Sequence, residues 1–598
     1  MDYRKEYEKW LHSDALTEAE KAELAAIAND DKEIEGRFFD QLSFGTAGLR
    51  GIMGVGLYRM NVHVIRHATQ SFAEVILEQG EEAVKRGVAV CYDCRNNSEL
   101  FAREAACVLA ANGIPVRLFE SMRPTPMVSF AVRKYGCIAG INITASHNPK
   151  EYNGYKVYWE DGAQLPPEHA DEVAKKMREL DVFSCYKTVN YDEALAAGKI
   201  VLMGEETDEA FLANVMTQVT DKAVVEKVAD DFKMVYTPFH GTGYQLIPEV
   251  LKRLGMKHVI CVPEQMVIDG DFPTVVSPNP ENPEGFYLAV DIAKKEGADF
   301  ILGSDPDADR VGIMVNTGNG EFKVLTGNQI GILLVDYTIG AWKRAGRMPA
   351  NPTVLKSIVS SEMARKVAES NGVACFDTFT GFKFLAQKKD QLEESGAGNV
   401  LMAFEESNGY MYGDYVRDKD AVTAALVLTE MGAWYADQGM TLNDAMESLY
   451  KKYGFYGEKT LNLVMPGLDG LKKIFEFLQI LTNDGFGNVI LNGTDDGQRG
   501  IAGDCTGGRG FAVADVAGIC MDLNDHIFYT ADTAQGGFEG GAKGNRDPAK
   551  PDICDFHRFY LLYFAISYMA DAIIWAFFMS LEISIYSSDL CSRTSSPG

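Results

Sequence analysis

Basic residues are scarce in this sequence of 598 residues, which has 57 Lys and Arg against 85 Asp and Glu and a formal net charge of −28. Nucleic acids and anionic membranes are bound through clusters of basic side chains that replace the counterions of phosphate groups. The composition therefore argues against nucleic-acid and membrane-surface partners. It is compatible with a small phosphate ester held by a few local basic residues.

Uninterrupted apolar stretches long enough to cross a membrane are also missing. The most apolar segment, Phe559–Ile585, contains Asp571 and Glu582. Each charge would be expensive inside a bilayer, and neither apolar piece beside them reaches the roughly 18–20 residues of a spanning helix. We expect no membrane anchor.

Closely spaced cysteine pairs are absent except for one CxxC motif, formed by Cys91 and Cys94. A zinc site would need a second pair, so we interpret this one as a coincidence at the end of a strand. The 11 cysteines are scattered without regular spacing, which suits a reducing compartment. Residues 1–6 lack the apolar core of a signal peptide. The expected location is the cytoplasm.

Short apolar runs alternate with longer helical segments over most of the chain. Expected strands are Gly87–Tyr92, Val116–Phe119, Ile138–Ile143, Lys233–Thr237, His258–Val262, Phe300–Gly303, Thr353–Lys356 and Val400–Phe404. Expected helices are Glu18–Ala28, Glu99–Ala111, Gln245–Leu254 and Gly285–Glu296, the first with Thr17 and Glu20 spaced as a capping box. This alternation indicates βαβ units and mostly parallel sheets, so we predict an α/β fold. Polar or Gly-containing stretches suggest boundaries near residues 200 and 322.

The composition changes after about Asp469. Glycine makes up 15 of the 70 residues from 481 to 550, against 57 of 598 overall, and the periodicity of strands and helices fades. Turn-forming residues such as Asp484 and Asp495-Asp496-Gly497 recur. We therefore predict coil in this stretch.

The strongest local signal is the TASHNP segment of residues 144–149, directly after the expected strand Ile138–Ile143. Ligands bind open α/β sheets at the carboxyl ends of strands. Ser146 could act as a nucleophile or a phosphate carrier beside His147 and the N–H groups of the loop. The alternative is a polar turn, because Ser, Asn and Pro all form turns.

A second signal is the DPDADR segment of residues 305–310, which follows the expected strand Phe300–Gly303. Its carboxylates at Asp305, Asp307 and Asp309 can converge on one cation when the loop curls, and such hard oxygen ligands suit Mg²⁺. One alternative is a solvated acidic loop. Another is the Asp-x-Asp of haloacid dehalogenase-like phosphatases, where a Thr or Val usually stands at the position of Asp309.

Two further segments could contact a phosphosugar. The FEESNGY segment of residues 404–410 ends the expected strand Val400–Phe404, and its carboxylates and hydroxyl suit hydrogen bonds to sugar hydroxyls. In the FGTAGLRG segment of residues 44–51, small residues let N–H groups approach an oxyanion and Arg50 can pair with phosphate. The alternative for the FEESNGY segment is an acidic turn or a helix cap. The alternative for the FGTAGLRG segment is a flexible Gly-rich loop, because this segment matches neither the P-loop motif nor the GxGxxG motif.

Together these segments, in this order along residues 40–455, resemble the α-D-phosphohexomutase family of phosphoglucomutases and phosphomannomutases. TASHNP and DPDADR at this separation are highly specific, and the YNGYK segment of residues 152–156 adds another family-like element. The long N-terminal part looks closest to the larger phosphoglucomutase type. The resemblance implies three consecutive α/β/α domains with mixed, mostly parallel sheets. After a helical extension over 1–40, they would be domain I with the phosphoserine loop over 41–200, domain II with the metal loop over 201–321 and domain III with the sugar-binding loop over 322–455.

The resemblance also implies residue roles. Catalytic residues would be Ser146 as the phosphoserine, His147, Arg50 and Lys156 as the acid/base lysine. Metal ligands would be Ser146, Asp305, Asp307 and Asp309, holding Mg²⁺ against a phosphoserine oxygen. Substrate would be bound by Thr380, Gly381, Glu405, Ser407, Lys419 and Arg310.

The reaction that the resemblance implies is the interconversion of glucose 1-phosphate and glucose 6-phosphate through a phosphoserine and glucose 1,6-bisphosphate. A phosphomannomutase or phosphopentomutase would differ only in sugar contacts that residues 405–407 do not settle. The family normally closes with a fourth domain whose Arg-x-Ser-Gly-Thr-Glu-Pro loop grips the substrate phosphate, and no such string follows Tyr456. We interpret residues 456–598 as a degenerate or non-native segment, such as out-of-frame sequence. A mutase relic with impaired activity therefore stays an alternative, and the oligomeric state is open.

Overall fold

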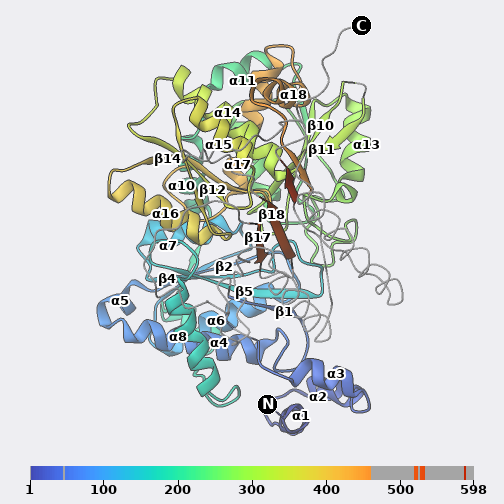
Figure 1. Ribbon diagram of the computed structural model, residues 1–598. Helices are drawn as coiled ribbons and strands as arrows, with labels where there is room; N and C mark the ends of the chain where they lie inside the picture. Colours follow the sequence, from blue (N-terminus) through green and yellow to red (C-terminus); the bar gives the residue numbers. More distant parts are fainter. Residues whose placement is uncertain are drawn as a thin grey trace, which may run out of the picture. The chain divides into compact units, whose positions relative to one another are not determined.

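Figure 1 shows the computed structural model of the chain, which describes residues 2–42, 44, 48–318, 320–459, 517–522, 526–531 and 585–587. The described residues up to Tyr456 belong to one compact unit. Gly457–Lys459 and the strands beyond residue 516 belong to a second unit.

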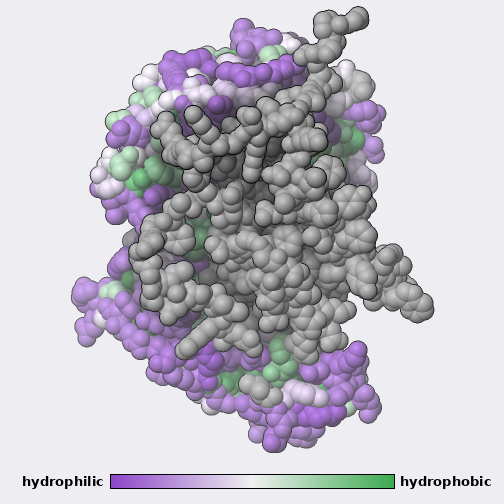
Figure 2. All heavy atoms as spheres, viewed as in Figure 1, coloured by the Kyte–Doolittle hydropathy of each residue, from purple (hydrophilic) through white to green (hydrophobic). Residues whose placement is uncertain are grey.

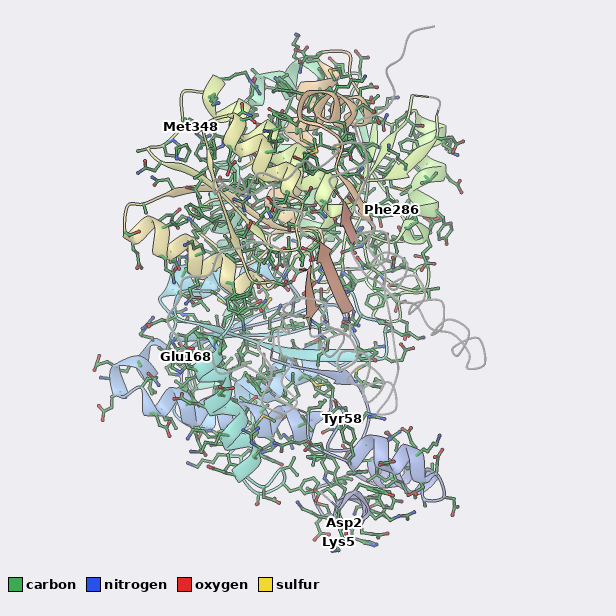
Figure 3. All side chains as sticks on the ribbon, viewed as in Figure 1. Asp2, Lys5, Tyr58, Glu168, Phe286 and Met348 are labelled. Atoms are coloured by element: carbon green, nitrogen blue, oxygen red, sulfur yellow. The ribbon has the colours of Figure 1, made fainter. Side chains whose placement is uncertain are left out.

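The chain starts with three short helices, α1 (Tyr3–Leu11), α2 (Glu18–Ala26) and α3 (Asp31–Phe38). Asp2 begins α1 because its side chain accepts a hydrogen bond from the backbone N–H of Lys5 at 3.3 Å (Figure 3). The predicted capping box of Thr17 and Glu20 is present at the start of α2. That helix ends two residues before its predicted end.

The first sheet has the strand order β1-β5-β4-β2-β3-β6, with β4, β2, β3 and β6 parallel and β5 and β1 antiparallel at one edge. Figure 1 shows α4, α6 and α8 on one side of this sheet and α7 on the other. The strands are β1 (Leu49–Ile52), β2 (Val88–Tyr92), β3 (Val116–Phe119), β4 (Ala139–Ile143), β5 (Tyr152–Trp159) and β6 (Ile200–Met203). The helices are α4 (Val62–Glu78), α5 (Glu81–Arg86), α6 (Ser98–Ala111), α7 (Pro126–Tyr135), α8 (Pro167–Glu179) and α9 (Tyr191–Ala196).

The second sheet has the order β11-β10-β9-β7-β8, in which β9, β7 and β8 are parallel. Phe286 (Figure 3) is fully buried against it, and a Cβ at Gly303 would lie 2.6 Å from its ring. The strands are β7 (Lys233–Thr237), β8 (His258–Cys261), β9 (Phe300–Ser304), β10 (Val311–Asn316) and β11 (Phe322–Val324). The helices are α10 (Glu205–Met216), α11 (Lys222–Val228), α12 (Gly243–Leu254), the 3₁₀ turn η1 (Pro283–Phe286) and α13 (Tyr287–Glu296).

The third sheet has the order β13-β12-β14-β15, with β13, β12 and β14 parallel and β15 antiparallel. Its strands are β12 (Pro352–Ser357), β13 (Ala374–Thr378), β14 (Asn399–Glu405) and β15 (Gly409–Met411). Its helices are α14 (Gly327–Arg344), α15 (Glu362–Ser370), α16 (Phe382–Glu394), α17 (Ala421–Ala436) and α18 (Leu442–Tyr453).

The α/β class with three mixed, mostly parallel sheets is confirmed. Every predicted strand is present with ends within two residues, whereas the antiparallel strands β1, β5, β10, β11 and β15 and the parallel edge strands β6 and β13 were not predicted. The first turn of the helix predicted over Gly285–Glu296 is 3₁₀. Cys91 and Cys94 are free thiols. The domain boundaries stay predictions.

The second unit contains strands inside a stretch that the sequence predicts as coil. β17 (Ala517–Asp522) pairs antiparallel with β18 (His526–Ala531), and β16 (Gly457–Lys459) pairs antiparallel with β19 (Ile585–Ser587). The prediction of coil is therefore wrong for β17 and β18, which contain the short apolar runs Ile519–Met521 and Ile527–Tyr529. The rest of residues 481–550 lies outside the described residues.

The described surface over the first sheet's helices is predominantly hydrophilic in the view of Figure 2, as the acidic composition leads one to expect. Among the described residues, none of the helices is both long and apolar enough to cross a membrane. The apolar segment that begins at Phe559 lies outside the described residues, apart from its last residue, Ile585.

The packing of α14 on β14 supplies a test of the third sheet. A Cβ at Gly331 would lie 2.3 Å from the ring of Phe404, whereas a Cβ at Gly340, in the same helix, would meet only the end of the Arg344 side chain. We expect Gly331→Ala to lower the unfolding free energy by about 1–3 kcal/mol through overpacking. Gly340→Ala should raise it by roughly 0.5–1 kcal/mol, because alanine favours helix. Denaturant unfolding followed by circular dichroism measures both; equal effects would contradict this packing.

Candidate active site

Three loops at the carboxyl ends of strands β4, β9 and β14 meet in the first unit. The loop after β4 contacts the loop after β9 through a hydrogen bond between Ser146 and Asp305. The loop after β9 contacts the loop after β14 through an isolated antiparallel bridge between Arg310 and Gly409. The carboxyl end of a parallel sheet is the expected place for a ligand site, and here three sheets contribute to one.

Ser146 stands at the centre of the first loop. Its Oγ donates a hydrogen bond to Oδ2 of Asp305 at 2.9 Å and lies 3.3 Å from Nδ1 of His147. Its backbone has φ of +51°, a left-handed conformation that is uncommon for residues other than glycine. The N–H of Ser146 donates to Oγ1 of Thr144 at 2.8 Å. The strained turn therefore aims the hydroxyl at the second loop.

Asp305, Asp307 and Asp309 form a buried cluster whose ligand oxygens all lie within 4.8 Å of one another. Burial, together with the charges of the other two carboxylates, raises the pKa of Asp305 well above its usual range. One oxygen each of Asp307 and Asp309 is buried without a hydrogen-bond partner. Orphaned carboxylate oxygens converging in one place fit a hard divalent cation, for which Ser146 could supply a further oxygen.

Lys156 connects this cluster to strand β5. Its Nζ lies 2.9 Å from Oδ2 of Asp307 and 3.2 Å from Oδ2 of Asp309. Burial alone would lower the pKa of Lys156, but the two carboxylates outweigh burial and raise it. Burial likewise opposes ionisation of Asp307, and the charge of Lys156 brings its pKa below the ordinary value. Lys156 is therefore protonated in this arrangement.

Two arginines flank the loops. Nη1 of Arg50, on β1, donates to Oδ1 of Asn148 at 2.8 Å, which places its guanidinium at the Ser146 loop. The backbone N–H of Arg310 donates to Oδ1 of Asp305 at 2.9 Å, and its Nη1 lies 3.5 Å from Glu281. Each arginine thus contacts one of the loops that meet here.

The third loop brings Glu405 to Gly381 and Lys419. Oε1 of Glu405 accepts a hydrogen bond from the N–H of Gly381 at 2.6 Å. Burial and the neighbouring Glu406 raise the pKa of Glu405 to about 7, against the opposing charge of Lys419. Nζ of Lys419 also lies 3.4 Å from Oδ2 of Asp309, so the predicted sugar loop touches the acidic cluster.

The structure brings most of the predicted site residues into one connected network. Ser407 and Thr380 are half-buried in the same loops as Glu405 and Gly381. Sequence reasoning missed Thr125, whose Oγ1 donates to Oδ2 of Asp307 at 2.6 Å. The sequence signal that could have identified it is a polar residue between Pro124 and Pro126, soon after the carboxyl end of the parallel strand β3.

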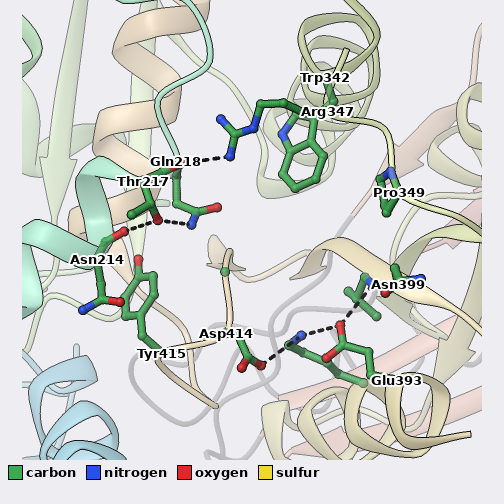
Figure 4. A pocket seen from close by; sticks show the side chains of 13 residues that line it. Asn214, Thr217, Gln218, Trp342, Arg347, Pro349, Glu393, Asn399, Asp414 and Tyr415 are labelled. Carbon is green, nitrogen blue, oxygen red and sulfur yellow. Dashed lines mark hydrogen bonds and ion pairs between the residues drawn. The ribbon is translucent and has the colours of Figure 1, made fainter. Parts of the chain in front are cut away.

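A cavity of about 550 Å³ lies at the other end of β14, beside Asn399, away from Glu405 (Figure 4). Nζ of Lys389 lies there 3.5 Å from Asp414 and 2.5 Å from Glu393. Arg347, which also lines the cavity, donates to the carbonyl oxygens of Val219 and Thr217. The charged side chains of this cavity thus have partners, in contrast to the orphaned oxygens of the aspartate cluster.

Comparison with protein families matches all three sheets. Residues 41–182 match phosphoglucomutase/phosphomannomutase α/β/α domain I, residues 209–318 match domain II and residues 326–453 match domain III. The Ser146 loop, the aspartate cluster and the Glu405 loop thus lie in domains I, II and III in turn.

Three curated relatives are each 34% identical to the chain. A phosphopentomutase of Pongo abelii aligns over 79% of this chain and 78% of its own length. A phosphoglucomutase of Staphylococcus saprophyticus aligns over 76% and 80%, and a glucose 1,6-bisphosphate synthase of Homo sapiens over 79% and 77%. In fold, the open form of pp63/parafusin from Paramecium is similar with a TM-score of 0.56 at 20% identity, over 74% of this chain and 81% of that one.

These matches exclude the haloacid dehalogenase-like alternative, in which Asp305 would be the nucleophile. In the structure Asp305 instead accepts the hydrogen bond of the Ser146 hydroxyl. The chain belongs to the α-D-phosphohexomutase superfamily and is a phosphosugar mutase, an intramolecular phosphotransferase.

Proposed function

We propose that the chain interconverts glucose 1-phosphate and glucose 6-phosphate through a phosphoserine at Ser146. The observation that carries this proposal is the 2.9 Å contact between Oγ of Ser146 and Asp305 inside a buried, under-compensated aspartate cluster. Phosphoryl transfer is catalysed mainly by positioning and by charge stabilisation. A fixed hydroxyl, an acidic cluster fit for a cation and flanking arginines supply both.

In the proposed reaction, Oγ of Ser146 gives up a phosphoryl group and later takes one back. The free sugar hydroxyl attacks the phosphorus on Ser146, the bond from phosphorus to Oγ breaks, and glucose 1,6-bisphosphate forms. After the bisphosphate reorients, Oγ attacks its other phosphoryl group and releases the isomeric monophosphate. Arg50 and Arg310 would stabilise the phosphoryl charge as it moves, a role that their contacts with the two loops support.

Asp305, Asp307 and Asp309 would hold Mg²⁺ with an oxygen of phosphorylated Ser146. Bound there, a divalent cation would supply positive charge against the phosphoryl oxygens and would compensate the carboxylate charge that keeps Lys156 protonated. Lys156 then exchanges a proton with the sugar oxygen, giving it when that oxygen leaves and receiving it when the hydroxyl attacks.

Sugar recognition falls to the third loop. Glu405, held by Gly381, can accept hydrogen bonds from sugar hydroxyls, with Ser407, Thr380 and Lys419 beside it. A pentose phosphate is a second candidate substrate, because a phosphopentomutase and a phosphoglucomutase resemble the chain equally at 34% identity. A mutase relic is the remaining alternative, since the Arg-x-Ser-Gly-Thr-Glu-Pro string is missing from the sequence.

Removing the phosphate carrier tests the reaction. With Mg²⁺ and catalytic glucose 1,6-bisphosphate, the wild type should convert glucose 1-phosphate to glucose 6-phosphate, and Ser146→Ala should lose more than about 10³-fold in kcat. Ser71→Ala removes another buried hydroxyl, one bonded only within α4, and should keep wild-type kcat. Net phosphate release would contradict a mutase. Absence of wild-type turnover would favour the relic, and faster turnover of ribose 1-phosphate would favour the pentose substrate.

Metal addition to the metal-free protein tests the aspartate cluster without activity. A ligand that binds only the folded state raises its stability, so MgCl₂ added after chelation should raise the thermal midpoint of the wild type. Asp307→Asn removes one anionic ligand and should abolish most of this rise, whereas Ser71→Ala should retain it. An equal rise in all three proteins would place the cation elsewhere.

The acidity of Glu405 predicts a pH dependence. Because folding raises its pKa from 4.5 to about 7, the ionised carboxylate lowers stability progressively as pH rises from about 4.5 to 7. Glu405→Gln removes this penalty, so its gain in unfolding free energy should be absent near pH 4, grow up to about pH 7 and then level off. Its kcat/KM should fall about 10- to 100-fold, because a charged acceptor is lost. A difference in unfolding free energy between Glu405→Gln and the wild type that does not change with pH would contradict the raised pKa of Glu405.

A further inference from the structure

Arg95, which no predicted motif contains, gathers the backbone of the Ser146 loop. Its Nη2 donates to the carbonyl oxygen of Ser146 at 2.6 Å and also to that of Asn148. Its Nη1 donates to the carbonyl oxygens of Pro149 at 2.8 Å and Tyr152 at 3.1 Å. One guanidinium therefore fixes four carbonyl groups along seven residues that carry the phosphate acceptor.

The guanidinium is itself held rigidly. The side chains of Arg95 and Asp93 are both completely buried, and Nε of Arg95 lies 3.4 Å from Oδ2 of Asp93. Oδ1 of Asp93 accepts hydrogen bonds from the N–H of Arg95 at 2.9 Å and from Oγ of Ser98 at 2.7 Å. Strand β2, which ends just before Asp93, thus anchors the arginine to the first sheet.

The same arginine also contacts domain II. Its guanidinium lies 5.1 Å from the ring centre of Phe272, which is buried and has φ of +47°, an outlier for a bulky side chain. Next to it, Oδ1 of Asp271 accepts a hydrogen bond from Nδ2 of Asn96 at 3.3 Å and lies 3.5 Å from Nζ of Lys150. Domain II therefore contacts both the segment around Arg95 and the end of the Ser146 loop.

This arrangement explains how a strained serine is kept in place. A left-handed residue costs of order 1–3 kcal/mol and persists only when its surroundings over-determine it. Four carbonyl groups converging on one point need a planar cation with several fixed donors, which arginine provides and the three rotating donors of lysine do not. If the proposed function holds, the rate of phosphoryl transfer depends on the position of Oγ of Ser146 relative to Asp305.

We propose that Arg95 is a positioning residue for phosphoryl transfer. It fixes residues 146–152 so that Oγ of Ser146 stays at the aspartate cluster, and Phe272 ties that backbone to the domain that carries the cluster. Arg95 touches no reacting atom; it acts through the loop backbone. The inference rests on the proposed function for its effect on rate, but its geometric part does not need turnover.

The rate test compares the buried Arg95 with Arg37, an arginine that is only partly exposed. Arg95→Lys keeps the charge but loses the fork, and we expect kcat to fall by at least about 100-fold with KM within about threefold, because small misplacement of reacting groups costs rate rather than binding. Arg37→Lys is the matched control. Arg37 bonds Glu33, Glu23 and the carbonyl oxygen of Val55, far along the chain from the Ser146 loop. Its kcat should stay near that of the wild type.

Hydrogen exchange of the full chain tests the geometry without activity. The amides of residues 144–152 should lose protection in Arg95→Lys and keep it in Arg37→Lys. Wild-type protection of this loop in Arg95→Lys would overturn the inference, whereas absence of wild-type turnover with the expected loss of protection would overturn only the proposed function.

Chemical rescue separates positioning from general destabilisation. Guanidinium ion added to Arg95→Ala should restore part of kcat, and the same ion added to Arg37→Ala should not. Phe272→Leu should reduce kcat by several fold without loss of folding. If Arg95→Ala does not fold, the variants Arg95→Lys and Phe272→Leu still test the positioning role of Arg95. A wild-type kcat in both of these variants would reject the proposal.

Discussion

The burial of three carboxylates in one loop is the constraint on which the site depends. Asp305, Asp307 and Asp309 lie together in the protein interior, where unpaired charge costs several kcal/mol. Lys156 of domain I and Lys419 of domain III reach this cluster from opposite domains. Charge compensation thus draws the three domains toward a single point, which is also the point where a phosphoryl group needs positive charge.

Three of the non-glycine residues with positive φ lie in or beside the loops that form the site. Ser146, Ala308 and Phe272 all adopt left-handed conformations without being glycine. Each lies in a loop that follows a strand end or joins two domains, and each is buried. Strain of this kind is retained where surrounding contacts over-determine the backbone, and the four carbonyl bonds of Arg95 show how that is done for Ser146.

The acidic composition acquires a local meaning in the structure. Acidic residues outnumber basic ones in the sequence, and among the buried basic side chains Arg95, Lys156 and Lys419 contact the loops of the site. A phosphosugar dianion is thus met by a small basic site inside a strongly anionic protein. Steering by net charge cannot assist its approach, so affinity has to come from the loops themselves.

The α/β class, the principal strands and the three motif loops can be predicted from the amino-acid sequence alone. Continuous apolar runs define buried parallel strands, and Ser146, Asp305 and Glu405 each come within a few residues of such a strand's carboxyl end. Only the tertiary structure decided that these loops share one network, that Glu405 is desolvated enough to raise its pKa, and that Arg95 and Thr125 support the site. The reason is physical: strand propensity and loop chemistry are local, whereas desolvation, charge pairing and the convergence of carbonyl groups on one guanidinium depend on residues that are distant in the chain.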